Sequence, residues 1–153
     1  MAGASGAEPI DTANGDERSV ASKRGLAVTS SAIAGTMKIP AGEADVSHSF
    51  TADVTPFVSA GKPITLHTAG LHMHTRGTTA RASVLPAAGG DECLLDLPEW
   101  DFHWQGAFEL EQPVVVNAGD RIKIECRWDN SLENQPIVNG KPTPPMELNW
   151  GES

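Results

Sequence analysis

Short runs of alternating apolar and polar residues make up most of the chain after residue 25. The clearest run is DRIKIECRW, residues 120–128, in which every second residue is apolar and most of the others are charged. Successive side chains of a β-strand point to opposite faces, so this pattern predicts a strand with one buried face and one wet face. The predicted buried face carries Ile122, Ile124, Cys126 and Trp128.

A similar alternation occurs in WDFHWQGAFEL, residues 100–110. It predicts a second strand, whose core-facing side chains are Phe102, Trp104, Phe108 and Leu110. Between these two runs, VNAGDR combines the Asn, Gly and Asp residues that favour a hairpin loop. The segment SLENQPIVNGKPTPPMEL, residues 131–148, has four prolines and no period, and is predicted to be a long excursion loop.

Many half-apolar strands without a helical period predict an all-β fold. An antiparallel jelly-roll β-sandwich buries such strands, and 153 residues suffice for a single domain with one core. We expect this domain to span residues 25–153. Residues 1–24 are rich in Ala, Gly, Ser and charged residues without any period, and are predicted to form a flexible N-terminal segment.

The charge and the absence of long apolar runs exclude two classes of partner. The formal net charge is −9, from 20 acidic against 11 basic residues, which disfavours binding to nucleic acid phosphates. No apolar run approaches the ~20 residues that a membrane-spanning helix needs. The first twenty residues also lack the basic-then-apolar order of a signal peptide.

The stretch TAGLHMHTRG, residues 68–77, contains the candidate chemistry, because His72 and His74 lie two residues apart. On a strand, both imidazoles would emerge on one face while Leu71 and Met73 point to the other, which is a geometry that can chelate a metal ion. The pair alone is a weak signal, since two neighbouring histidines can also bond to backbone or solvent.

Three kinds of metal site are compatible with the pair, and they differ in the third ligand. A zinc hydrolase or hydratase would take a third histidine, for which His103 is the candidate. A cupin-like site would need a glutamate soon after the pair, and TRGTTARA offers none. A copper site would take a soft thioether. Apart from this zinc alternative, His48, His67 and His103 are predicted to be structural.

Four segments in order, LHMHTRG, LPEWDFHWQGAFEL, VVVNAGDRIKIECRWDNS and NWGES, resemble the C-terminal catalytic domain of the copper type II, ascorbate-dependent monooxygenases. This family includes dopamine β-monooxygenase and peptidylglycine α-hydroxylating monooxygenase, and the resemblance covers about residues 37–153. It implies a jelly-roll sandwich in which His72 and His74 are ligands of the copper that meets dioxygen. It also implies ascorbate as electron donor, a small-molecule or peptide substrate, and an extracellular or periplasmic location.

The chain departs from the family pattern at its end. The family's methionine ligand belongs to an acidic Glu-Met-Cys-like motif beyond the turn that NWGES matches, whereas this sequence stops at Ser153 and Met146 lies before NWGES. The same motif supplies the family's partner for the cysteine matched by Cys126. We therefore expect Cys126 to lack that partner, which leaves Cys93 as a free thiol, a core residue or a substitute partner.

The resemblance also implies a second copper, held in a preceding domain that this sequence lacks. We expect the chain to be part of a larger monooxygenase, incomplete at its C-terminal end and inactive in isolation. The alternative is a non-catalytic metal-binding β-sandwich module. A Glu-Met-Cys-like motif within about a dozen residues downstream of Ser153 would favour the enzyme.

Overall fold

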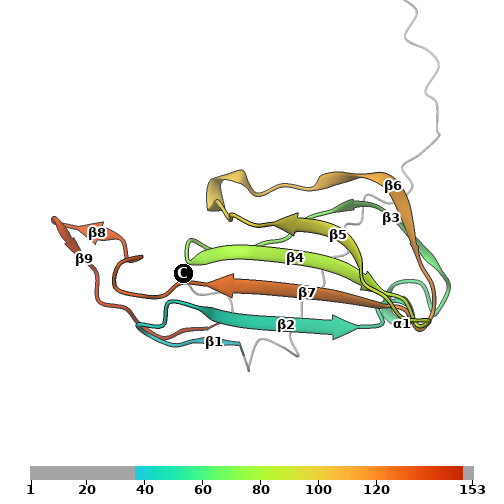
Figure 1. The fold of residues 1–153 in the computed structure, drawn as a ribbon, viewed down its shortest axis with the longest axis horizontal. Helices are drawn as coiled ribbons and strands as arrows, with labels where there is room; N and C mark the ends of the chain where they lie inside the picture. The colour runs from blue at the N-terminus through green and yellow to red at the C-terminus, as the bar shows by residue number, and fades with distance from the viewer. Residues whose placement is uncertain (1–36, 150–153) are drawn as a thin grey trace, which may run out of the picture.

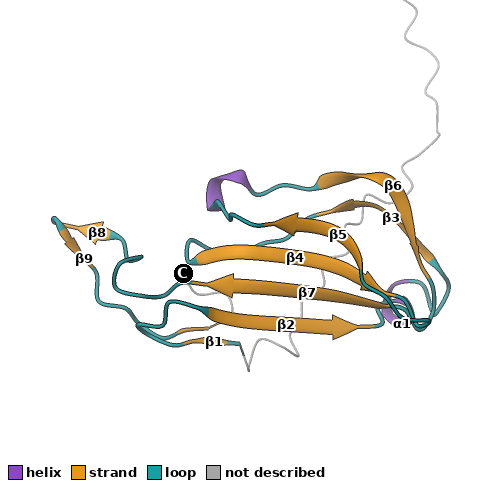
Figure 2. Cartoon of the chain, in the orientation of Figure 1, coloured by secondary structure: helices purple, strands orange, loops and turns teal. Residues whose placement is uncertain are grey.

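Antiparallel β-strands form nearly all the regular structure of the chain (Figures 1 and 2). The computed structural model describes residues 37–149, so the predicted flexible segment 1–24 lies outside the described residues, and the proposed domain limits of 25–153 stay a prediction. No helix in residues 37–149 is long and apolar enough to cross a membrane.

The strands and helical turns follow one another in a fixed order along the chain. Their bounds are β1 Lys38–Ile39, β2 Val46–Ala52, α1 Thr55–Val58, β3 Ile64–Ala69, β4 Gly77–Leu85, β5 Glu92–Leu97, the 3-10 turn η1 Phe102–Trp104, β6 Phe108–Val116, β7 Arg121–Trp128, β8 Ile137–Val138, β9 Lys141–Pro142 and β10 Leu148–Asn149.

Two layers make up the sandwich. One layer is a four-stranded sheet in the order β2-β7-β4-β5, and the other is the pair β3–β6. Two small additional pairs are formed by β1 with β10 and by β8 with β9. Every one of these pairings is antiparallel. In Figure 1 the four-stranded sheet crosses the middle of the molecule and β6 lies above it. The all-β antiparallel sandwich predicted from the sequence is confirmed.

A first core cluster fills the space between the two layers. Val84 of β4 and Ile122 of β7 pack with Val116 of β6 and Val54, and each of these side chains is at most 7 % exposed. The alternation predicted for β7 is confirmed at its two ends, where Ile122 and Trp128 are buried and Arg121 and Arg127 are exposed. In the middle of the strand the residues of both faces are half-buried, although Ile124 and Cys126 pack against the core clusters.

A second core cluster lies toward the other end of the sheet. Ile39 of β1, Ala80 of β4 and Trp128 of β7 enclose Met73, whose side chain is only 3 % exposed. Met73 does not belong to a strand, since it lies in the connection between β3 and β4. This cluster therefore fixes the segment of the chain that contains the two histidines.

The strand predicted over residues 100–110 is wrong in its first half. Residues Phe102–Trp104 form a 3-10 turn, and the side chain of Trp104 is 82 % exposed instead of core-facing. The turn forms because the Asp101 carboxylate accepts a hydrogen bond from the His103 backbone N–H at 2.8 Å, which is the local bonding that aspartate offers as an alternative to a strand. The strand β6 begins only at Phe108, which is 41 % exposed.

The excursion predicted over residues 131–148 projects from the sandwich at the left of Figure 1. It is less irregular than expected, because it contains the small hairpin β8–β9. Asn139 and Gly140 form the hairpin turn with φ angles of +53° and +74°. Asn-Gly is the preferred sequence for a two-residue turn with two positive φ angles, so the dipeptide at 139–140 itself indicates a hairpin.

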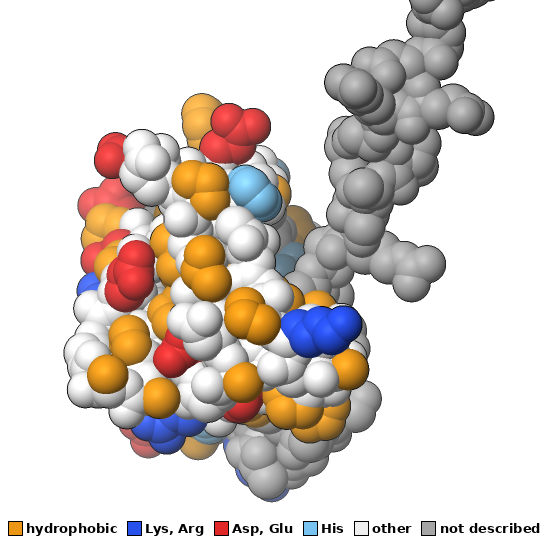
Figure 3. All heavy atoms as spheres, turned by 90° about the vertical axis from the view of Figure 1, so that its right-hand side faces the viewer, with side chains coloured by type: hydrophobic (Ala, Val, Ile, Leu, Met, Phe, Trp, Pro, Cys, Tyr) orange, Lys and Arg blue, Asp and Glu red, His pale blue; other side chains and the backbone are white. Residues whose placement is uncertain are grey.

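Figure 3 shows the opposite end of the sandwich, where α1 lies. Two aspartates at this end accept hydrogen bonds from backbone N–H groups of the loops. Asp120, 7 % exposed, accepts backbone hydrogen bonds from Ala87 at 2.9 Å and Asn117 at 2.8 Å. Asp53 accepts one from Gly119 at 2.9 Å. The bonds from Ala87 and Asn117 hold the pKa of Asp120 below its ordinary value of 3.8, because they favour the ionised form.

Replacement of Ile122 by alanine is expected to lower the free energy of unfolding by about 2–5 kcal/mol, because it opens a cavity between the layers. Arg121→Ala, on the wet face of the same strand, is the control and is expected to change it by no more than about 0.5 kcal/mol. Urea titration followed by circular dichroism measures both values. Equal losses at the two positions would contradict the assignment of faces.

Asp120→Asn is expected to lower the thermal unfolding midpoint at pH 7. The pKa of Asp120 is lower in the folded than in the unfolded chain, so its stabilisation is complete above the unfolded value of 3.8 and is lost as the pH falls through the folded value. The difference between variant and parent should therefore shrink in scans below pH 3.8. Asp96→Asn, at an exposed site, is the control, and a difference that stays constant with pH would contradict the prediction.

Candidate metal centre

His72 and His74 lie side by side on the segment that connects β3 to β4. Their ring centroids are 5.1 Å apart and their planes meet at 82°. The segment is not the strand that the sequence pattern suggested, because β3 ends at Ala69 and β4 begins at Gly77. Burial still alternates along it, since Met73 is buried in the core while His72 is exposed and His74 is half-buried.

Two glycines allow this segment to take its path. A Cβ atom on Gly70 would lie 2.8 Å from the backbone oxygen of Gly106, so only glycine permits this close approach to the chain that precedes β6. The backbone N–H of Gly77 donates to the carbonyl of His74 at 3.0 Å and closes a turn. A Cβ atom on Gly77 would meet the Met73 side chain at 2.8 Å.

The environment of His74 favours a ligand at its ring. The Phe102 ring packs against it at a centroid distance of 6.1 Å. Its Nδ1 atom is enclosed by protein and has no hydrogen-bond partner among the described residues. A buried polar atom is normally satisfied by protein, water or a metal, so an unpartnered imidazole nitrogen beside a second imidazole fits a metal site.

His103 does not join the pair. The Phe102 ring, 6.1 Å from that of His74, lies 5.8 Å from the His103 ring on the 3-10 turn. The side chain of His103 is 84 % exposed, and its Nδ1 lies 3.1 Å from the Asp101 carboxylate. The hydrogen bonds from the backbone N–H of His103 and from its ring lower the pKa of Asp101. The structure therefore gives no support to a zinc site with three histidines.

The two remaining histidines lie on other strands. His48 of β2 contacts the carbonyl of Lys38 through Nε2 at 2.8 Å, and its ring lies 5.7 Å from that of Trp128. His67 is exposed on β3, next to an irregularity in its pairing with β6. Within residues 37–149, no group of three or more His, Cys, Asp or Glu side chains could hold a metal ion.

The side chains of Met73 and Met146 lie in different environments. Met73 turns into the core. Met146, in the excursion, is 69 % exposed, and its backbone carbonyl accepts a hydrogen bond from Asn130 at 2.8 Å. The described residues thus offer a metal two imidazoles, which is a donor type that suits copper and zinc alike.

Both cysteines are free thiols, so the alternative in which Cys93 pairs with Cys126 is wrong. Cys93 lies opposite Ser83 on β4, and Ser83 lies opposite Lys123 on β7, three residues from Cys126. Two strand spacings of about 4.8 Å already exceed the ~7 Å limit between the Cα atoms of a disulfide. Burial raises the pKa of Cys126 to about 11, so its thiol stays protonated at neutral pH.

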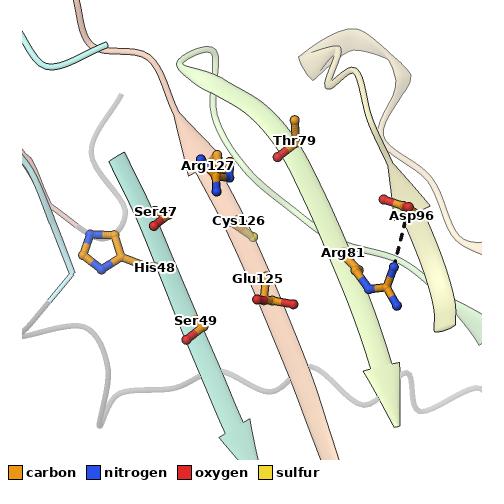
Figure 4. A pocket seen from close by; sticks show the side chains of 9 residues that line it. All are labelled: Ser47, His48, Ser49, Thr79, Arg81, Asp96, Glu125, Cys126 and Arg127. Atoms are coloured by element: carbon orange, nitrogen blue, oxygen red, sulfur yellow. Dashed lines mark ion pairs between the residues drawn. The ribbon is translucent and has the colours of Figure 1, made fainter. Parts of the chain in front are cut away.

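A concavity of about 350 Å³ lies on the four-stranded sheet, and none of its lining residues belongs to the histidine pair (Figure 4). Most of its lining side chains come from the outer, wet face of β2, β4 and β7. Its charges are neutralised locally, by the ion pairs Arg81–Asp96 at 3.8 Å, Lys123–Glu125 at 2.9 Å and Arg127–Asp45 at 2.7 Å. We regard it as the solvated face of the sheet and not as part of the metal centre.

A buried polar network that no sequence motif indicated is bonded to the turn that follows the pair. Asn130 and Gln135 are 1 % and 8 % exposed, and Gln135 accepts a hydrogen bond from Arg76, two residues after His74. Its residues are spread over three segments of the chain, so only the folded structure brings them together.

Comparison with known proteins identifies the domain. The profile of the copper type II ascorbate-dependent monooxygenase C-terminal domain matches residues 23–144, which is well over half of the 153-residue chain. A search of curated proteins found no match. The match includes the histidine pair, the 3-10 turn and β7, and the family's β-sandwich agrees with the antiparallel layers described above. The chain belongs to the copper type II ascorbate-dependent monooxygenase family, as its C-terminal domain.

Proposed function

We propose that His72 and His74 are two ligands of a copper ion, and that the domain is the part of a larger monooxygenase in which a substrate C–H bond is hydroxylated with dioxygen. The observation that supports this proposal is the adjacent pair of rings, 5.1 Å apart, in which Nδ1 of His74 is enclosed without a partner. Histidine suits this role, because imidazole binds copper in both of its common oxidation states.

The two histidines have different parts in this proposal. His74, half-buried between the core and Phe102, fixes the position of the ion. His72 is exposed, so the ion would be open to dioxygen and substrate on that side. Copper, when bound, supplies the one-electron redox chemistry for which the family uses ascorbate.

The side chains next to the pair form the surface that a substrate would contact. Phe102 and Trp104 of the 3-10 turn are 38 % and 82 % exposed, and Phe102 contacts the His74 ring. We propose a small-molecule or peptide substrate that reaches the pair from this side. Electron supply from ascorbate and a second copper would come from the rest of the parent protein.

A second candidate is a metal-binding module without turnover. It is favoured by one observation, which is that no third His, Cys, Asp or Glu ligand joins the pair within the described residues. Both candidates require the same copper-binding pair and differ in whether a third, soft ligand is added. Hydroxylation activity of the full-length parent protein, abolished by His74→Ala, would distinguish the enzyme from the module.

Titration of the chain with Cu(I) and Cu(II) against a chromophoric chelator tests the pair directly. We expect the double variant His72→Ala, His74→Ala to lose at least tenfold in affinity, because both imidazole ligands are removed. Binding by the parent should also weaken as the pH is lowered, since protons compete with the metal for the imidazoles.

Two matched variants serve as controls in this titration. His67→Ala removes an exposed histidine of β3 and is expected to leave the affinity unchanged. His103→Ala tests the zinc alternative and is also expected to have no effect. Full copper affinity in the double variant, or a large loss in His103→Ala, would overturn the assignment.

A further inference from the structure

We propose that Gln135 is a positioning residue for the copper centre, which acts on His74 through Arg76. The excursion loop, remote from the histidines in sequence, would then set the geometry of the pair. This inference rests on the proposed function of His72 and His74 and adds to it a residue that lies outside the metal ligands.

Arg76 connects the histidine turn to the excursion loop by two separate bonds. Its guanidinium donates from Nη2 to Oε1 of Gln135 at 3.0 Å. Its backbone carbonyl accepts from the N–H of Asp129 at 2.9 Å. Arg76 also lies inside the turn that the Gly77 N–H closes on the carbonyl of His74. A displacement of Arg76 would therefore be passed to the backbone of His74.

Gln135 is itself held from the other side. Its amide nitrogen lies 2.8 Å from the carbonyl of Ser131 and 3.0 Å from Oδ1 of Asn130. Because the nitrogen faces two acceptors, the amide oxygen must face Arg76; the reverse orientation would set an NH₂ group against the guanidinium. Only one orientation of the Gln135 amide thus satisfies both of its ends, and the side chain is buried.

Asn130 anchors this arrangement to the core. Its Nδ2 donates to the carbonyls of Pro40 at 2.9 Å and Met146 at 2.8 Å, and its backbone N–H donates to Glu43 at 2.8 Å. The side chain is 1 % exposed. Hydrogen bonds therefore connect Asn130 through Gln135 to Arg76, and Asn130 and Gln135 are buried, where such bonds are strong and directional. Arg76 itself is half-buried and reaches His74 through the backbone of the turn.

His74 is restrained by this network from one side and by the core from the other. Met73 fixes the backbone on the core side, and the bond from the Asp129 N–H to the Arg76 carbonyl attaches the turn at a second point. The Arg76–Gln135 bond adds a side-chain attachment to these two. Ligand geometry in metal sites commonly depends on such outer contacts, and their loss typically lowers metal affinity by roughly 10- to 100-fold.

The test uses Gln135→Met, which keeps the side-chain volume and removes both hydrogen-bonding groups, and Arg76→Met, which removes the other partner. Gln112→Met makes the same change at an exposed position of β6 and is the control. The 153-residue chain is loaded with Cu(II) for electron paramagnetic resonance, and its Cu(I) affinity is measured by competition with a chelator. Circular dichroism and a thermal scan establish that each variant is folded at the working temperature.

We expect Gln135→Met and Arg76→Met each to lower copper affinity by about tenfold or more and to change the Cu(II) hyperfine splitting in the same way. The double variant should lose little beyond either single variant, because both changes break one chain of contacts. Gln112→Met should match the parent in both measurements. A purely structural role would lower the thermal midpoint without changing the Cu(II) spectrum.

Two results would overturn the inference, and they are distinguishable. If His72→Ala, His74→Ala binds copper like the parent, the proposed function fails and the inference fails with it. If copper binding depends on the histidines but folded Gln135→Met and Arg76→Met keep the parent's affinity and spectrum, only the positioning role of Gln135 is overturned.

Discussion

The burial of Met73 is the constraint on which the candidate centre depends. Its side chain, 3 % exposed, packs among Ile39, Ala80 and Trp128, which come from three different strands. Because the residues on either side of a buried residue in an extended chain point away from the core, this packing turns both histidines outward. The pair therefore needs no strand of its own. The hydrophobic core orients His72 and His74 even though the segment that contains them makes no sheet hydrogen bonds.

The two ends of the sandwich are stabilised by different chemistry. At the α1 end, the carboxylates of Asp53 and Asp120 accept backbone N–H groups from neighbouring loops, so the stability of this end depends on pH. At the end that contains the histidines, the amides of Asn130 and Gln135 take the same role. Amides do not titrate, so the hydrogen bonds that Asn130 and Gln135 make persist over the pH range in which protons and metal compete for imidazole.

The sequence predicted correctly those strands in which apolar residues alternate with polar ones because one face of the strand is buried. The strand β7 matched, because its apolar side chains all pack against one or the other of the two core clusters. Residues 102–104 did not, because alternation also occurs by chance in a turn, and the bond from Asp101 to the His103 backbone outweighs it. The proximity of His72 to His74 followed from their spacing. The network of Arg76, Asn130 and Gln135 could not have been predicted, since it depends on long-range contacts that leave no local pattern.

The two imidazoles are restrained to different degrees, which has a consequence for the centre. His74 is enclosed, contacts Phe102, and belongs to a turn attached at both Met73 and Arg76. His72 is exposed, and its ring contacts that of His74. A copper ligand set must tolerate the different geometries that the two oxidation states prefer. One imidazole fixed by the scaffold and one free to adjust its ring would meet that requirement without movement of the sheet.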